Sequence, residues 1–376
     1  MTARRVPVLV LAGFLGAGKT TLLNHLLTNA TGVRIGAVVN DFGSVPVDAL
    51  SVAGQVDSMV AFGNGCLCCA VDTEELDGAL ARLADPAAGI DLIVIEASGL
   101  AEPPTLVRMV LASEHPGVIY GGLVQVVDAV EHDRLRERQP ATDRYTALAD
   151  LVVLNKTDLV PDAHRAALLA DLRDRAEGSP VVAASHGRID PGLLVDGPAD
   201  DRTTVPWPRQ LSFADLLAEH AGAGRGPADH PHVGYQSVSF HSEEPLDAGR
   251  LMDFLDGRRA GLYRIKGFVR IAGGARYTLH AVGRFLRFFP DPPPAGDAAP
   301  TSLVLIGTGL DPAALRAELA ACRATDQRPE GEPGDQQAHW RLLRFVDRAG
   351  APEDDPAGAR EPAEPWAAAA SSPDRG

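Results

Sequence analysis

The chain has 376 residues, of which 45% are hydrophobic and 23% charged, and its formal net charge at pH 7 is −15. This length and composition are typical of a globular protein with two domains and additional segments. The acidic balance and the lack of Lys/Arg clusters exclude nucleic acid as a general ligand, because phosphate contacts require such clusters.

The sequence contains no apolar stretch that approaches the roughly 20 residues needed to cross a bilayer. A cleaved leader would remove the glycine-rich motif at residues 13–20, so we expect no leader, no membrane association and a cytoplasmic protein. Three of the four cysteines, Cys66, Cys68 and Cys69, are close together in the chain. In a reducing compartment this spacing indicates metal ligands or redox thiols and not a disulfide framework.

From residue 5 to about 200, short apolar runs alternate with stretches of helical spacing. Strands are predicted at 8–12, 34–39, 56–61, 91–96, 122–127, 150–154 and 180–183. Helices are predicted at 19–28, 72–84, 103–112, 142–147 and 161–176. Apolar strands separated by helices predict an α/β domain, residues 1–222, in which helices cover both faces of a mostly parallel sheet. Phosphate sites in such a domain lie at the C-terminal ends of the strands.

The pattern changes after a short helix predicted at 212–220. Residues 223–232 are rich in glycine and predict a linker. The following residues 233–324 predict a small α+β domain with an antiparallel sheet. Its predicted strands are 234–241, 263–272, 277–288 and 302–306, and its predicted helices are 246–257 and 311–321.

The last segment, residues 325–376, is rich in proline, alanine and acidic residues. We expect this tail to be disordered because its composition cannot bury enough apolar surface. One apolar island within it, Trp340–Phe345, has two interpretations, a short docking helix or an incidental cluster, and we favour the second.

Residues 13–20 read Gly-Phe-Leu-Gly-Ala-Gly-Lys-Thr and lie between a predicted strand and a predicted helix. In this context the backbone N–H groups and the helix N-terminus bind phosphate. Lys19 is expected to reach the β- and γ-phosphates, and the Thr20 hydroxyl is expected to bind Mg²⁺. The predicted nucleotide contacts are Gly13, Gly16, Ala17, Gly18, Lys19, Thr20 and Thr21.

A second nucleotide motif, Asn155-Lys-Thr-Asp158, directly follows the predicted strand 150–154. The Asp158 carboxylate can accept hydrogen bonds from N1 and N2 of guanine, which adenine cannot donate, so the motif predicts GTP over ATP. Asn155 would brace the loop and the stem of Lys156 would lie on the base. His186, after the next predicted strand, is assigned to the guanine side.

Acidic residues follow two further strands. Glu96, at the end of the predicted strand 91–96, is expected to hold Mg²⁺, and the N–H of Gly99 to meet the γ-phosphate. Asp41 follows the second strand and has three interpretations: a ligand of Mg²⁺, a metal ligand beside the cysteines, or an Asx-turn.

The segment Gly65-Cys-Leu-Cys-Cys69 follows the predicted third strand. Three thiolates from one tight loop can occupy three corners of a tetrahedral Zn²⁺ site, with the fourth position open for another ligand. Redox sensing is the alternative for these thiols. Cys322 lies alone on the last predicted helix, and we interpret it as a core residue.

Together these motifs resemble the CobW-type family of P-loop GTPases, metal chaperones or metallocentre insertion GTPases. The segments that carry the resemblance are 13–20, 40–43, 65–69, 96–103, 155–158, 263–268 and 303–307. The resemblance implies GTP hydrolysis with Lys19, Thr20 and Glu96 as catalytic residues. It also implies a transition metal at Cys66, Cys68 and Cys69, and delivery of that metal to a client metalloprotein. Of the three interpretations of Asp41, we take a further ligand of this metal as the prediction.

We therefore predict a GTP-hydrolysing metal chaperone that uses Mg²⁺ and carries Zn²⁺ or, as the alternative, Co²⁺. Three other functions are compatible with the sequence: a regulatory GTP-dependent binding protein with a structural zinc, a small-molecule kinase, and a redox GTPase. The sequence leaves the oligomeric state open, a homodimer included.

Overall fold

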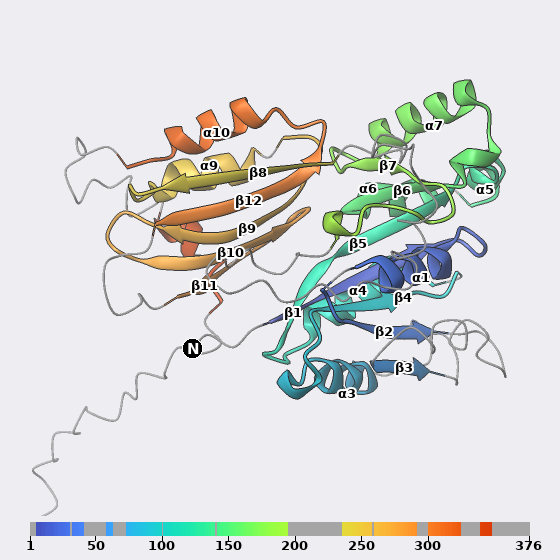
Figure 1. Ribbon diagram of the computed structural model, residues 1–376, viewed down its shortest axis with the longest axis horizontal. Helices are drawn as coiled ribbons and strands as arrows, with labels where there is room; N and C mark the ends of the chain where they lie inside the picture. The colour runs from blue at the N-terminus through green and yellow to red at the C-terminus, as the bar shows by residue number, and fades with distance from the viewer. Residues whose placement is uncertain are drawn as a thin grey trace, which may run out of the picture.

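The computed structural model describes residues 5–30, 32–40, 58–62, 73–99, 101–139, 141–194, 235–257, 259–291, 300–324 and 339–347. Within these residues the chain forms a 7-stranded sheet and a 5-stranded sheet (Figure 1). Strand pairs in the first sheet are parallel and those in the second are antiparallel. The predicted fold class, an α/β domain followed by a small α+β domain, is confirmed.

The first sheet has the strand order β3-β2-β4-β1-β5-β6-β7. Its strands are β1 (Val6–Gly13), β2 (Ile35–Asn40), β3 (Ser58–Phe62), β4 (Leu92–Glu96), β5 (Val118–Asp128), β6 (Leu151–Asn155) and β7 (Val181–Ala183). Leu11 pairs with Glu96, and Asp128 pairs with Asn155. This register brings the C-terminal ends of the central strands to one edge, where the predicted nucleotide motifs follow them.

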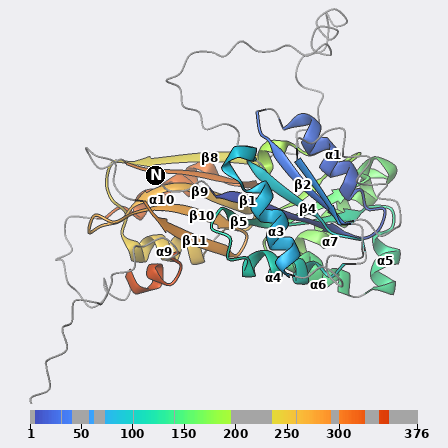
Figure 2. The same cartoon turned by 90° about the horizontal axis from the view of Figure 1, so that it is seen from below.

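Successive side chains of β1 alternate between two apolar cores, because strand residues point to opposite faces. Val8 and Val10 belong to the core formed with α3 (Thr73–Leu83), α4 (Pro103–Ala112) and α7 (Asp162–Arg175), whereas Leu9 and Leu11 pack with α1 (Lys19–Asn29). Figure 2 shows α1 on one side of the sheet and α4 and α6 (Ala141–Leu148) on the other.

The remaining short elements of this domain connect strands to helices. Helix α5 (His132–Arg138) follows β5 and precedes α6. The 3-10 helices are η1 (Pro86–Ala88), η2 (Thr157–Leu159) and η3 (Pro191–Leu193). After β1 the chain continues to the face that α1 covers, and after β5 it continues to the face that α6 covers. Such a reversal opens a crevice at the C-terminal ends of neighbouring strands.

The second sheet has the order β11-β10-β9-β12-β8. Its strands are β8 (Tyr235–Ser242), β9 (Leu262–Arg270), β10 (Arg276–Val282), β11 (Phe285–Pro290) and β12 (Thr301–Thr308). Two helices, α9 (Ala248–Asp256) and α10 (Pro312–Ala321), bury Leu251, Leu255 and Leu319 in its core. Each helix begins at an aspartate that accepts backbone N–H bonds, Asp247 for α9 and Asp311 for α10.

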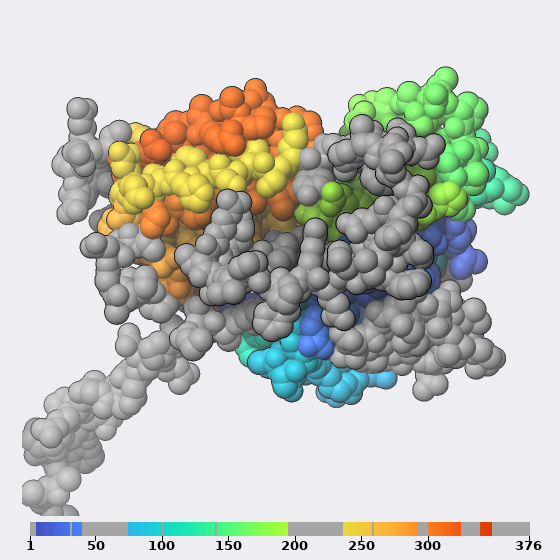
Figure 3. Space-filling model, viewed as in Figure 1, coloured from blue at the N-terminus to red at the C-terminus, as the bar shows by residue number. Residues whose placement is uncertain are grey.

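The two domains lie side by side along the long axis of the molecule (Figures 1 and 3). Tyr263 and Val282 of the second sheet are buried in the same apolar cluster as α1 and the first sheet. At this boundary the ring nitrogen Nε2 of His280 lies 3.0 Å from the Tyr120 carbonyl oxygen. The second domain thus completes one of the cores of the first.

Three expectations are corrected by the structure. The single strand predicted at 277–288 is the pair β10 and β11, because the chain turns at Gly283, whose φ is 51°. Helix α5 was not predicted. The segment 339–347, predicted within a disordered tail, packs on the second domain: Leu342 is fully buried, and the Phe288 N–H donates to the Phe345 carbonyl at 2.9 Å.

Other predicted features lie outside the described residues, namely the helix at 212–220, the linker at 223–232 and most of the tail. Among the described residues, no helix has both the length and the apolar character that a membrane crossing would need.

Candidate functional site

The glycine-rich turn between β1 and α1 has the conformation that phosphate binding requires. Gly16 and Gly18 have φ values of 78° and 100°, in the left-handed region that favours glycine. Gly16 is exposed, and a Cβ there would meet nothing within 4 Å, so the turn borders open space at this position. A Cβ at Gly18 would lie 2.2 Å from Asn155 Nδ2, so Gly18 permits contact with the guanine motif. The turn therefore fits a phosphate chain.

Lys19 lies at the start of α1 and is only 7% exposed. Its Nζ donates to the carbonyl oxygens of Gly13 and Phe14, at 3.0 and 3.3 Å. The ammonium group is thus held over the same turn that a phosphate chain would occupy. If Lys19 binds the phosphates as predicted, its ammonium group would donate to phosphate oxygens in place of these two carbonyl oxygens.

The predicted magnesium ligands are in contact. The Thr20 hydroxyl donates to Glu96 Oε1 at 2.7 Å, and Glu96 is 4% exposed. A hydroxyl and a carboxylate beside a phosphate site are the hard oxygen ligands that Mg²⁺ prefers. The pair fits this ion, and parallel strands β1 and β4 bring it together.

Gly99, in the loop after β4, lies directly against the glycine-rich turn. A Cβ at this position would be 2.6 Å from the backbone nitrogen of Leu15. Only glycine permits so close an approach. The loop after Glu96 and the phosphate turn are therefore in close backbone contact at this point.

Asn155 joins the two predicted halves of the nucleotide site. It is 2% exposed; its Nδ2 donates to the Ala17 carbonyl, and its Oδ1 accepts from the Gly187 N–H, both at 2.9 Å. One side chain thus fixes the phosphate turn relative to the loop after β7. The bracing role that the sequence predicts for Asn155 is compatible with these two hydrogen bonds and stays a prediction.

The other members of the guanine motif point toward the same region. Lys156 has a left-handed backbone, with φ of 61°, and its Nζ lies 2.5 Å from Asp128 Oδ2. Asp158 is exposed, and its Oδ2 lies 3.4 Å from His186 Nε2. The assignment of His186 to the guanine side stays a prediction. Thr21 is exposed beside the phosphate turn. The sequence analysis did not identify Asp128. The feature that could have identified it is a carboxylate at the end of β5, the strand beside the one that ends at Asn155.

The predicted transition-metal ligands, Cys66, Cys68, Cys69 and Asp41, lie outside the described residues. Among the residues that the structure does describe, no group of three or more His, Cys, Asp or Glu side chains is arranged to hold a metal ion. Val39 of β2 pairs with Glu96, and Asn40 pairs with Phe62 of β3. The two segments that carry the predicted ligands therefore begin at the strand edge that holds Glu96.

Cys322 is a core residue, as predicted. It follows α10 in the second domain, is 3% exposed, and its Sγ donates to the Glu318 carbonyl at 3.3 Å. Burial raises the pKa of this thiol to about 11. It belongs to the core of the second domain and not to the strand edge described above.

Comparison with known proteins gives two family matches. The model described as "CobW/HypB/UreG, nucleotide-binding domain" matches residues 7–183, and the "Cobalamin synthesis protein cobW C-terminal domain" matches residues 235–323. The boundary between the matches coincides with the boundary between the two sheets.

Curated relatives align along most of their length. A zinc chaperone CobW of Sinorhizobium sp is 30% identical over 356 residues, which cover 84% of this chain and 97% of the relative. A zinc chaperone CobW of Pseudomonas aeruginosa is 31% identical over 374 residues, covering 86% and 93%. Among solved structures, the Zn(II)-bound YjiA GTPase of Escherichia coli is 24% identical with a TM-score of 0.40, covering 85% of this chain and 100% of that chain.

Proposed function

Since this chain belongs to the CobW family of GTPase metal chaperones, we propose that its GTP cycle controls a zinc site formed by Cys66, Cys68 and Cys69. The zinc is cargo that passes to a client metalloprotein in the cytoplasm. Asp41 is the proposed fourth ligand. Thiolate ligands favour Zn²⁺ over Co²⁺ by affinity order, which makes zinc the first choice.

The observation that carries the nucleotide part of the proposal is the Asn155 bridge. Asn155 binds both the phosphate turn, at the Ala17 carbonyl, and the Gly187 N–H of the loop after β7. Asp158 lies on the same loop system, with a carboxylate that is open to a base. A purine with an N1–H and an exocyclic amine satisfies this carboxylate, so guanine is the supported base.

Hydrolysis at this site relies on positioning and charge stabilisation. The N–H groups of the turn and the Lys19 ammonium would bind the phosphates and stabilise the charge that develops as the γ-phosphoryl group leaves. Thr20 and Glu96 would hold Mg²⁺, which when bound would neutralise phosphate charge. The Gly99 N–H would bind the γ-phosphate, and loss of that phosphate would affect the turn through the close approach of Gly99 to Leu15.

The link between nucleotide and zinc is supported by the strand register. Asp41 follows β2 directly, and the cysteines follow β3, the strand that pairs with β2. Because β2 pairs with β4 at Glu96, a movement of Glu96 would be transmitted through β2 and β3 to the residues that follow these two strands. If GTP alters zinc affinity, zinc must alter GTP affinity by the same factor.

The test is a competition titration of Zn²⁺ and Co²⁺ into reduced, full-length protein under anaerobic conditions. Zinc affinity is measured with a GTP analogue, with GDP and without nucleotide, and we expect it to differ between the nucleotide states by roughly 5-fold or more. The variant Cys66→Ser/Cys68→Ser/Cys69→Ser should lose the site. The control Cys322→Ser removes a buried cysteine and should keep it.

Two results would contradict the proposal. Equal zinc affinity in all three states would favour a structural zinc in a regulatory GTPase. Loss of zinc in the Cys322→Ser control would place the metal elsewhere.

A further inference from the structure

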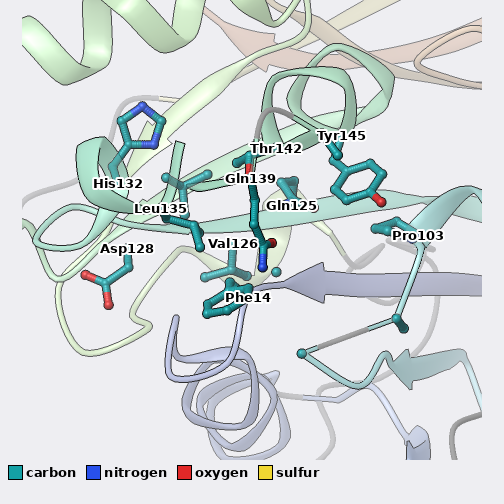
Figure 4. Close-up of a pocket in the computed structure, with 15 residues that line it drawn as sticks. Phe14, Pro103, Gln125, Val126, Asp128, His132, Leu135, Gln139, Thr142 and Tyr145 are labelled. Carbon is teal, nitrogen blue, oxygen red and sulfur yellow. The ribbon is translucent and has the colours of Figure 1, made fainter. Parts of the chain in front are cut away.

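A cavity of about 270 Å³ lies beside the phosphate turn, on the face of the first sheet that α4 and α6 cover (Figure 4). Its floor is formed by Gly13 and Phe14 at the end of β1 and by Gly99. Its walls come from β5 and from the helices on either side of it. After β1 and after β5 the chain continues to opposite faces of the sheet, and ligand sites in parallel sheets form at such places.

Gln125 supplies a polar group at the base of this cavity. Val124 and Val126 of β5 belong to the α1 core, so strand alternation turns Gln125 toward the opposite face, where α4 and α6 lie. Gln125 is 4% exposed, and its Oε1 is buried without a hydrogen-bond partner. Buried amide oxygens are almost always paired in proteins, so this one favours a ligand that carries a donor.

Apart from His132, the rest of the lining is uncharged or already paired. Pro103, Leu135 and Tyr145 contribute apolar surface, and Figure 4 shows Phe14 opposite Thr142. The Asp128 carboxylate accepts from Lys156 Nζ at 2.5 Å and from the Val130 N–H at 2.9 Å. His132, also in the lining, has its Nε2 3.7 Å from Asp171 Oδ2, and both of its ring nitrogens are buried without a hydrogen-bond partner. A charged ligand would find no free opposite charge at these walls.

We propose that this cavity binds a small, uncharged, largely apolar ligand that donates a hydrogen bond to Gln125 Oε1. Its volume is near the lower end of ligand cavities, about 300 to 1,000 Å³, which indicates a fragment-sized molecule. The cavity shares Gly13 and Gly99 with the proposed nucleotide site, and its other lining residues are not among the predicted nucleotide contacts. The proposal does not depend on GTP hydrolysis.

The test compares two probes of nearly the same shape, indole and benzofuran. Indole has an N–H donor where benzofuran has an oxygen. Binding to the full-length protein is measured by ligand-observed NMR without nucleotide, so the result does not bear on the GTPase. We expect indole to bind about tenfold more tightly than benzofuran, because only indole satisfies the Gln125 oxygen.

Three variants locate the site. Gln125→Met keeps the side-chain length and removes the acceptor, and it should abolish the preference for indole. Gln139→Met makes the same change at an exposed amide of the same lining, and it should keep the preference. Ala141→Phe fills the cavity from an exposed position on its rim and should abolish binding of both probes.

The proposal is overturned if wild-type protein binds neither probe or binds both equally. It is also overturned if binding survives in Ala141→Phe, or if the preference is lost in Gln139→Met. Thermal unfolding checks that each variant is folded. Should Gln125→Met fail to fold, the wild-type comparison and Ala141→Phe still decide the outcome.

Discussion

At the scale of single residues, base selection depends on Asp158. Asp158 is exposed beside His186, and its carboxylate has two oxygens that can accept hydrogen bonds from a base. Asp158→Asn replaces one acceptor with a donor, which suits xanthine and not guanine. We expect GTP affinity to fall by roughly 100-fold or more, and XTP affinity to rise, because sites built on such hydrogen bonds discriminate by this order.

Competition against a fluorescent GDP analogue measures both affinities. The matched control is Asp162→Asn, a highly exposed residue at the start of α7, which should change neither. Equal weakening of GTP and XTP by Asp158→Asn would mean that the carboxylate shapes the loop and does not read the base.

Motif spacing was sufficient to place Asn155, Lys156 and Asp158 at the end of a strand, since they occur in a fixed local order. It was insufficient for Asp128, because the Lys156–Asp128 contact depends on the pairing of β5 with β6. The sequence shows neither which strands are neighbours nor their register. Residues that act through such pairing are found only in the folded sheet.

Cys322 offers a second prediction at this scale. Its thiol is 3% exposed and burial raises its pKa to about 11, so at pH 8 almost none of it is the reactive thiolate. Brief treatment of the metal-free native protein with iodoacetamide, followed by peptide mass spectrometry, should label Cys66, Cys68 or Cys69 and leave Cys322 unmodified. Labelling in denaturant is the control and should include Cys322. Fast native labelling of Cys322 would mean that α10 opens readily.

At the scale of elements, a charged cluster joins α5, α6 and α7. Arg175 makes two 2.8 Å hydrogen bonds to Asp171 and one of 2.9 Å to Asp143, and Arg136 of α5 reaches Asp143 at 3.2 Å. This cluster explains why α5 escaped prediction. Residues 132–138 read His-Asp-Arg-Leu-Arg-Glu-Arg and lack an apolar stripe, so the helix is held by partners on other helices.

The cluster predicts a loss of stability in acid. The hydrogen bonds from Arg175 hold the pKa of Asp171 below its ordinary value. A lowered carboxyl pKa stabilises the fold above the ordinary value, about 4, and this contribution is lost as the pH falls through the folded-state pKa. The difference in unfolding free energy between wild type and Asp171→Asn should therefore be largest near neutral pH and shrink below about pH 4.

Urea unfolding at a series of pH values measures this difference. Asp174→Asn is the control, since Asp174 is an exposed residue of the same helix and acts on Arg175 only through charge. A difference that stays constant with pH would mean that Asp171 contributes through packing and not through its charge.

At the scale of the whole molecule, the two domains share an apolar core that could not be predicted from the sequence. Each domain was predictable because its strands and helices follow local periodicity. The contact between them was not, since Tyr263 and Val282 have the same apolar character as residues of an ordinary strand. For a related reason, docking of the island Trp340–Phe345 was the interpretation that we did not favour: a short apolar segment within a polar tail is stable only because β11 offers it a partner.

The domain boundary depends on a close approach that one glycine permits. Asp150 of the first domain is buried and accepts from the Tyr120 hydroxyl at 2.6 Å and the Leu123 N–H at 2.9 Å. Gly283, in the turn between β10 and β11, faces this carboxylate. A Cβ at Gly283 would lie 1.6 Å from Asp150 Oδ1, so any side chain must displace either the turn or Asp150.

Gly283→Ala should therefore separate the cost of a clash from the cost of an unfavourable backbone conformation. Its matched control is Gly273→Ala, because Gly273 also has a positive φ, +90°, but a Cβ there would meet nothing within 4 Å. Both variants lose about 1 to 2 kcal/mol through the left-handed backbone. Gly283→Ala should lose a further ~1 to 3 kcal/mol as Asp150 is pushed away from its hydrogen bonds.

Gly283→Ala should also weaken GTP binding, because Asp150 immediately precedes β6, the strand that ends at Asn155. Urea unfolding and nucleotide titration measure the two effects, and equal losses in both variants would mean that the domain boundary yields without disturbing the nucleotide site.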